Sequence, residues 1–212
     1  MTTGISCPTA SLSQKEVSHD RLSFRRKIWQ KDWRQSVIRS LEGKSPKVHP
    51  TAFISETAYI VGDVEIGENS NIWPGAVIRG DEGKIVIGRN VTVQDNSVVH
   101  GDADVYIGDN VTVAHGVICH AERIESNVLL GNGAVVNWGV HIGEYSLVGS
   151  GAAVVDGAKI PPRSLVLGVP ARIVGQVQER HIALIQRVAQ NYVRKGQRYK
   201  KEGNLEASSY MR

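Results

Sequence analysis

Histidine is the residue type in this sequence whose spacing most directly suggests chemistry. Three of the seven histidines, His100, His115 and His120, fall within 21 residues. Neutral imidazole is a common ligand of divalent metals, and three imidazoles can hold zinc with one coordination position open. A single exposed histidine is usually an ordinary surface residue, so the metal hypothesis depends on whether the fold brings these rings together. The other four histidines are interpreted as ordinary side chains: His19, His49, His141 and His181.

The segment around these histidines is built from six-residue repeats. Written in sixes from Val48, it reads VHPTAF, ISETAY, IVGDVE, IGENSN, IWPGAV and IRGDEG, and with short insertions the repeat continues to Ala171. Nearly every block opens with Ile, Val or Leu, and its fifth residue is usually Ala, Val or Ser. One distinctive block in three opens at residues 66, 87, 107, 124 and 142, so three sixes make a unit of about eighteen residues.

Such a repeat predicts a parallel β-helix over residues 48–175, an all-β solenoid of about seven coils. In each block a large aliphatic residue points inward, a small residue precedes the corner, and Gly, Asn or Asp takes the backbone angles of the turn. Stacking pairs each strand with its equivalent one coil on, at about 4.8 Å. A meander or sandwich of short strands would carry hairpin signals every 8–12 residues or so, which this segment lacks.

The stacking of coils predicts where the three clustered rings lie. His100 and His120 are the second residues of blocks on the same face of consecutive coils. They are therefore expected about one strand spacing apart, which suits two ligands of one tetrahedral metal. His115 is the third residue of the preceding block and points across a different edge. It reaches the same metal only from a neighbouring chain, if the solenoids pack around a threefold axis.

The composition excludes several classes of protein. Among the 212 residues no stretch approaches the ~20 apolar residues of a membrane span, and the first 30 lack the apolar core of a secretory signal. Cys7 and Cys119 are the only cysteines, which excludes a disulfide framework and a Cys-rich zinc site. A reducing, cytoplasmic location is therefore expected.

The net charge of +4 is distributed unevenly along the chain. Residues 1–47 carry +6, residues 48–175 carry −7 and residues 176–212 carry +5. Basic arms can bind nucleic acid or anionic lipid, or they can neutralise the acidic middle within one chain or between chains. Because the arms lack an RNA-binding pattern and a long unbroken basic run, neutralisation is favoured and no nucleic-acid partner is expected.

Both arms carry apolar residues at helical spacing. A C-terminal amphipathic helix is predicted over residues 176–202, lying along a coil face or a neighbour. In the basic N-terminal arm, residues 1–47, a helix is predicted over 22–42. Such a helix can lie on a membrane surface, but a cap on the open end of the solenoid or a partner contact is favoured. Residues 1–19 and 203–212 are predicted to be disordered.

Three stretches around the histidines read IWPGAVIRGDEGKIVIG, VQDNSVVH and VAHGVICH. Together they resemble the γ-class carbonic anhydrase family, and the resemblance covers about residues 48–200. It implies a homotrimer of left-handed β-helices that hydrates CO2 to bicarbonate. It also implies a catalytic metal, zinc with iron(II) or cobalt(II) as alternatives, bound by His100 and His120 of one subunit and His115 of the next.

Further site residues follow from the resemblance one at a time. Arg79 and Asp81 match the family's inter-subunit charge pair beside the site. Gln94 matches the glutamine that orients the metal-bound solvent. Tyr192 matches a tyrosine of the C-terminal helix near the metal, and Glu82 stands where the family's prototype has a catalytic glutamate.

Two departures from the family pattern leave the activity open. The prototype carries a long acidic loop with a proton-shuttle glutamate after the first histidine, whereas only GDAD follows His100 here, and Thr92 replaces an asparagine. Short-loop relatives include active and apparently inactive anhydrases, thioesterase-like proteins and structural subunits. The alternatives are a non-catalytic trimeric scaffold and a hexapeptide-repeat acyltransferase or acyl-CoA thioesterase. Acyltransferases of this architecture typically use one catalytic histidine and a long protruding loop.

Overall fold

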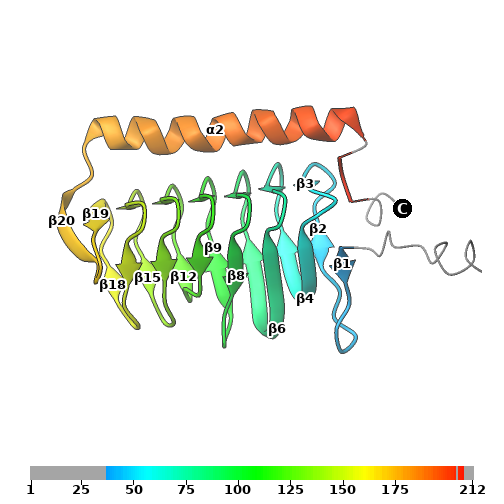
Figure 1. Ribbon diagram of the computed structural model, residues 1–212, viewed down its shortest axis with the longest axis horizontal. Coiled ribbons are helices and arrows are strands. Elements are labelled where there is room, and N and C mark those ends of the chain that lie inside the picture. Colours follow the sequence, from blue (N-terminus) through cyan, green and yellow to red (C-terminus); the bar gives the residue numbers. More distant parts are fainter. Residues whose placement is uncertain (1–36, 204, 208–212) are drawn as a thin grey trace, which may run out of the picture. The chain divides into compact units, whose positions relative to one another are not determined.

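The computed structural model describes residues 37–203 and 205–207, which form a parallel β-helix with one long helix running along it (Figure 1). The strands stack into about seven turns, so the β-solenoid predicted from the six-residue period is confirmed. Each turn passes through three flat faces. They are called the first, second and third face, in the order in which the chain meets them from β1 onward. Strands on one face pair in parallel with their equivalents one turn on.

The strands divide among the faces as follows. The third face contains β3 (Phe53–Ile54), β5 (Asn71–Ile72), β7 (Thr92–Val93), β10 (Thr112–Val113), β13 (Leu129–Leu130), β16 (Leu147–Val148) and β19 (Ser164–Leu167). The first face contains β1 (Ile38–Arg39), the starts of β4 (Tyr59–Ile66) and β6 (Val77–Ile87), and then β8 (Val98–His100), β11 (Ile118–Cys119), β14 (Val135–Val136) and β17 (Ala153–Val154). The second face contains β2 (Lys47–Val48), the ends of β4 and β6, and then β9 (Val105–Ile107), β12 (Arg123–Ile124), β15 (His141–Ile142) and β18 (Lys159–Ile160).

The register between coils follows the sequence repeat. Thr92 pairs with Thr112 and Thr112 with Leu129, offsets of 20 and 17 residues that equal the intervals between the distinctive blocks. The added residues lie at the corner between the first and second faces. There β4 and β6 run through the corner without a break, and their register shifts between Gly62 and Val64. This corner has the most variable length, and it carries the site described below.

Asparagine side chains hold the corner between the second and third faces. Asn69, Asn90, Asn110 and Asn127 all have positive φ, between 56° and 59°. Asparagine tolerates this left-handed conformation better than most residues. The Asn90 side-chain amide donates to Asn110 Oδ1 at 3.1 Å, and the Asn110 amide donates to Asn127 Oδ1 at 3.2 Å. The turn residues therefore also link one coil to the next.

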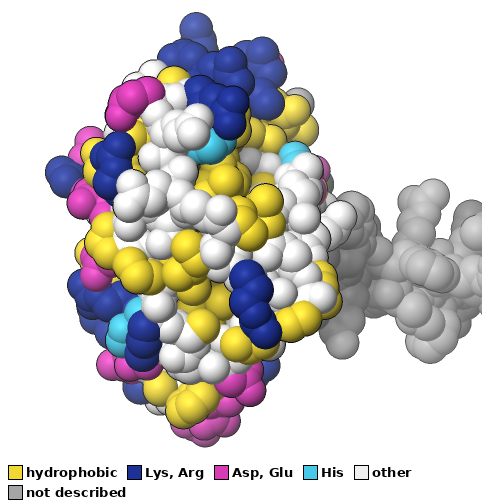
Figure 2. Space-filling model, turned by 90° about the vertical axis from the view of Figure 1, so that its left-hand side faces the viewer, with side chains coloured by type: hydrophobic (Ala, Val, Ile, Leu, Met, Phe, Trp, Pro, Cys, Tyr) yellow, Lys and Arg dark blue, Asp and Glu magenta, His cyan; other side chains and the backbone are white. Residues whose placement is uncertain are grey.

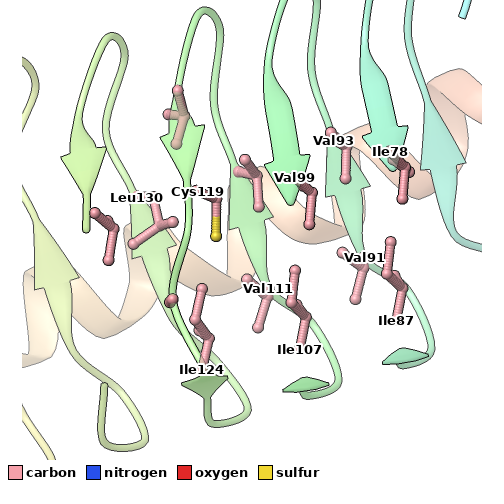
Figure 3. Close-up of a cluster of buried hydrophobic side chains, with 14 of the residues drawn as sticks. Ile78, Ile87, Val91, Val93, Val99, Ile107, Val111, Cys119, Ile124 and Leu130 are labelled. Carbon is pink, nitrogen blue, oxygen red and sulfur yellow. The ribbon is translucent and has the colours of Figure 1, made fainter. Parts of the chain in front are cut away.

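The interior of the solenoid is filled mainly with aliphatic side chains from all three faces of the coils (Figure 3). Fully buried examples from all three faces are Ile78, Val99, Cys119, Ile107, Ile124, Val93 and Leu130. A group of aromatic rings lies outside this interior, between the third face and the long helix. Phe53 and Trp73 have ring centroids 5.4 Å apart, and Tyr199 of the helix lies 5.0 Å from Trp73. The narrow core accounts for the low phenylalanine content.

The long helix α2 (Glu179–Glu202) covers the third face. It starts three residues later than the sequence predicts, because β20 (Arg172–Gln176) first pairs antiparallel with β19. Ile185 is fully buried against Leu129 and Leu147. At the far end, a Cβ at Gly196 would lie 2.9 Å from Asn71 Cβ, so glycine permits a close approach there. None of the helices in the described residues is long and apolar enough to cross a membrane.

The last coil ends in the antiparallel pair of β19 and β20. Ile173 and Val174 of β20 are 50% and 56% exposed, and the neighbouring Val169 is 74% exposed. Figure 2 looks onto this end of the solenoid, where hydrophobic side chains lie between charged groups and Lys and Arg gather at the top, over α2. The added strand covers the edge of β19, and it leaves an apolar surface on the outside.

Two predictions for the ends of the chain are wrong where the structure describes them. Of the helix predicted over 22–42, Ile38–Arg39 forms β1, which pairs with Ile60 of β4. Of the tail predicted to be disordered, Glu206 bridges to Ser55, and the Ala207 amide donates to Ile54 O at 2.9 Å. In both cases hydrogen bonds to a distant strand fix the segment. The remaining parts of these predictions, residues 1–36, 204 and 208–212, lie outside the described residues.

Candidate metal centre

Two of the three clustered histidines lie side by side at the corner between the first and second faces. His100 ends β8 and His120 directly follows β11, while Val99 and Cys119 before them pair in register and point inward. Because strand residues alternate, the next residue on each strand points outward. The two imidazole rings are stacked, with centroids 5.2 Å apart and planes 11° from parallel. The structure thus brings these two predicted ligands together.

Arg79 and Asp81, predicted as a charge pair, contact His100 from the preceding coil. Arg79 pairs with His100 in the register of β6 and β8. The Arg79 guanidinium contacts the Asp81 carboxylate, and Asp81 Oδ1 lies 3.0 Å from His100 Nε2. Burial raises the pKa of Asp81, but hydrogen bonds from Arg79 and His100 outweigh burial and leave the pKa below its ordinary value. The carboxylate stays charged and orients the imidazole ring within one chain.

Asp102, which the sequence reasoning missed, lies beside His120. Asp102 Oδ1 is 3.5 Å from His120 Nε2, which is too long for a good hydrogen bond. His120 Nε2 is buried and has no hydrogen-bond partner within the described part of the chain. One donor atom each of His100, Asp102 and His120 lie within 4.8 Å of one another. Two imidazoles and a carboxylate, with one imidazole nitrogen buried and unsatisfied, fit a divalent metal such as zinc or iron(II).

His115 lies at the opposite edge of the first face, in the turn between β10 and β11. It precedes β11 and His120 follows β11, so the two side chains lie at opposite edges of the first face. His115 Nδ1 lies 2.9 Å from Asp95 Oδ2, and its Nε2 lies 3.2 Å from the Tyr192 hydroxyl. Because a carboxylate only accepts, Nδ1 carries the proton and Nε2 presents its lone pair. Within one chain the structure does not bring His115 to the other two histidines.

The three remaining predicted residues divide between the two edges. Burial raises the pKa of Tyr192, and the Asp95 charge adds to this, so its hydroxyl stays protonated and donates to His115. Gln94 is buried after β7, and its backbone N–H donates to Val113 O at 2.9 Å, so it lies near the His115 edge. Glu82 is exposed on β6 directly after Asp81, on the edge that carries His100.

An apolar hollow of about 260 Å³ adjoins His120. Its lining includes Asp102, Val105, Ala121 and the exposed ring of Trp138. The hollow therefore places apolar side chains next to the potential metal ligands. This is the arrangement expected where a small, uncharged molecule is held beside a polar centre.

The spacing of coils is the signal that would have found the missed carboxylates. Asp95 precedes its partner His115 by 20 residues, and Asp102 precedes His120 by 18. Asp81 precedes His100 by 19. Each interval is about one coil, so an aspartate one coil before a histidine is a candidate neighbour. Aspartate is also a common turn residue for backbone reasons, and residue type alone does not separate the two roles.

Known proteins similar to this chain carry several names. Residues 45–80 match the sequence family described as bacterial transferase hexapeptide (six repeats). A carbonic anhydrase of Geobacillus kaustophilus is 42% identical over 166 residues, 77% of this chain and 91% of that protein. Gamma carbonic anhydrase 1, mitochondrial, of Arabidopsis thaliana is 34% identical over 75% of this chain, which spans 61% of that protein's length.

Two further similar proteins are named differently. The carnitine operon protein CaiE of Escherichia coli (strain K12) is 37% identical over 142 residues, 66% of this chain and 72% of that protein. The crystal structure of a hexapeptide transferase family protein from Anaplasma phagocytophilum has a TM-score of 0.75 and 36% identity, over 77% of this chain and 98% of that one. Proteins similar to this chain therefore carry the names of more than one function.

Proposed function

The chain belongs to the γ-class carbonic anhydrase family of hexapeptide-repeat proteins, and we propose that it hydrates CO2 reversibly to bicarbonate at a divalent metal shared between subunits. One observation carries the proposal: the stacked imidazoles of His100 and His120, with the buried Nε2 of His120 left without a hydrogen bond in the described residues. A buried nitrogen of this kind needs a partner, and a metal ion satisfies it.

In this proposal a homotrimer completes the site. His100 and His120 of one subunit and His115 of the next would be the ligands, of zinc or else of iron(II) or cobalt(II). The position of His115 at the opposite edge of the first face supports a second chain as its source. So do the outward-facing apolar side chains of that face, including Val98, Val135 and the 42% exposed Ile118. Contact between subunits would bury them.

The reaction would be CO2 + H2O ⇌ HCO3⁻ + H⁺. A divalent metal held by imidazoles supplies the Lewis acidity that makes water a nucleophile near neutral pH. Asp81 would keep His100 in its binding orientation, and Gln94 would orient the attacking oxygen. Tyr192 and Arg79 would support the rings on the two edges. The exposed carboxylate of Glu82 would take the released proton to the solvent.

A second candidate function is supported by the similarity to CaiE and to a protein named as a hexapeptide transferase. It is a trimer of the same fold that either serves as a scaffold or acts on acyl groups. The short GDAD loop after His100 also favours it, because this loop lacks the acidic extension of the family's prototype. The cytoplasmic location stays a prediction under both functions.

Metal analysis and a CO2-hydration assay on the same preparations test the proposal. Full-length protein is loaded separately with Zn²⁺, Fe²⁺ or Co²⁺, and hydration is followed by stopped flow with a pH indicator. His100→Ala should lose both the metal and the activity. His141→Ala is the matched control, because His141 is also half-buried on a strand and paired with a carboxylate, Glu122. Metal without hydration would favour the scaffold, and absence of metal from the wild type would reject the shared site.

A further inference from the structure

His100, Asp102 and His120 are three potential ligands within one chain, whereas the proposed catalytic site takes its third histidine from a neighbour. We propose that these three side chains form an intrachain divalent-cation site, which takes up the metal in a single protomer before His115 of the neighbouring subunit joins it. This inference rests on the proposed function, because it concerns the same two histidines. It adds Asp102 as a ligand and gives the metal a route into the site.

The donor atoms are close enough for one cation. They lie within 4.8 Å of one another, and ligands of one tetrahedral zinc lie about 3.4 Å apart when each bond is about 2.1 Å. The rings are held in place, since the side chains of His100 and His120 are only 14% and 27% exposed and coil stacking fixes their backbones. Asp102 is 62% exposed in the loop between β8 and β9. This exposed carboxylate can move toward the two fixed rings.

The electrostatics of the corner favour a cation. The unsatisfied His120 Nε2 faces a carboxylate oxygen at 3.5 Å, and a cation between them satisfies both. Glu122 lines the adjoining hollow and adds negative charge. The positive charge of Arg79 lies close by, but it is paired with the Asp81 carboxylate. The corner therefore attracts a divalent cation before any second chain arrives.

The third histidine is not available in a single chain. His115 lies at the opposite edge of the first face, beside Asp95 and the Tyr192 hydroxyl. Two histidines and one carboxylate form a recognised ligand set that leaves further coordination positions open. One such open position is where His115 of the neighbouring subunit enters on assembly. Asp102 thus acts as the ligand of the unassembled chain.

The test removes the inter-subunit ligand and asks whether metal still binds. Co²⁺ is titrated into His115→Ala, His115→Ala/Asp102→Asn and His115→Ala/Asp104→Asn, by visible absorption and equilibrium dialysis. Asp104 is the matched control, because it lies in the same loop and its Oδ1 accepts the Lys84 amide at 2.8 Å. Asparagine removes the same charge there and keeps an acceptor. We expect one equivalent of Co²⁺ per chain in His115→Ala, binding weakened more than about tenfold by Asp102→Asn, and little change with Asp104→Asn.

Two outcomes overturn the inference: a folded His115→Ala that binds no Co²⁺, or equal affinity with and without Asp102. Circular dichroism checks the fold, and the side chain of His115 is 48% exposed, so its removal leaves no cavity. A second measurement uses the wild-type background, where Asp102→Asn should slow Co²⁺ uptake and Asp104→Asn should not. Equal uptake rates also overturn the inference. If one of these outcomes is found and the wild type still binds metal and hydrates CO2, only the intrachain site is rejected and the proposed function stands. A wild type that binds no metal rejects both the intrachain site and the proposed function.

Discussion

Replacement of Ile185 by alanine measures how firmly α2 is held on the solenoid. Ile185 is fully buried in a small cluster with Leu129 and Leu147, each 9% exposed. Truncation of a buried isoleucine to alanine costs about 2–5 kcal/mol, and the value depends on how far the site can close around the lost atoms. Because this cluster lies near the surface and a helix can shift onto a sheet, we expect about 2–3 kcal/mol.

Ile107→Ala provides the contrast. Ile107 is also fully buried, but it lies inside the coil, where β9 is hydrogen-bonded to strands on both sides. The surrounding backbone cannot move inward without breaking these ladders, so the cavity stays open. We therefore expect a cost of about 4–5 kcal/mol for Ile107→Ala. Ile173→Ala is the matched control, because Ile173 is 50% exposed on β20, and it should cost less than about 1 kcal/mol.

Urea unfolding followed by circular dichroism measures the three free energies of unfolding. Protein concentration must be held constant, because assembly contributes to the stability of an oligomer. At about 2–4 °C per kcal/mol, Ile185→Ala should lower the midpoint of thermal unfolding by about 4–12 °C. A cost for Ile185→Ala as large as that for Ile107→Ala would contradict the reasoning about closure. A cost no larger than that for Ile173→Ala would contradict the packing of α2.

Three further predictions concern assembly, proton transfer and acid stability. Light scattering of the metal-loaded protein should give about three times 23.1 kDa, and a monomer with stoichiometric metal would exclude a shared site. Glu82→Ala should slow CO2 hydration mainly in dilute buffer and be rescued by imidazole, whereas Gln94→Ala should not be rescued; equal rescue would refute these roles. Burial raises the pKa of Asp109. Hydrogen bonds from the Arg89 side chain and backbone amide lower this pKa by more, so the folded-state pKa lies below its ordinary value. The contribution of Asp109 to the free energy of unfolding is present above the unfolded-state pKa of about 3.9 and is lost as the pH falls through the folded-state value. The urea midpoints of wild type and Asp109→Asn should therefore converge below about pH 4. A difference that stays constant with pH would contradict this sign.

The coils could be predicted from the sequence because the interior accepts one kind of residue at one spacing. The ends could not. Ile38 lies within the helix predicted over 22–42, yet it forms a strand because it pairs with Ile60 of β4. Glu206 has no local pattern at all, and a bridge to Ser55 fixes it. Contacts between residues far apart in the sequence override local preference at both places.

The histidine pair could be placed for the same reason as the coils. His100 and His120 occupy equivalent positions one coil apart, so the period alone brings their rings together. Asp95 and Asp102 were missed because an aspartate at a turn is expected for the backbone's sake. The block positions also put His115 on a different edge, where only a neighbouring chain could bring it to the pair, and the family resemblance implies such a chain.

Helix α2 returns the chain from the last coil to the first. The Gln197 side-chain amide donates to Thr51 O at 2.8 Å across 146 residues of sequence, and Lys200 Nζ lies 2.6 Å from the buried Glu206. Solenoids generally grow by adding one coil to the next, with either end free to fray. Here the residues that cover the first coil are synthesised long after it. The outer face of the first coil therefore stays exposed while the other coils stack. Folding during synthesis can proceed coil by coil, but it is completed only when the helix closes this long loop, and this slow, non-local step leaves the solenoid without a free end at its first coil.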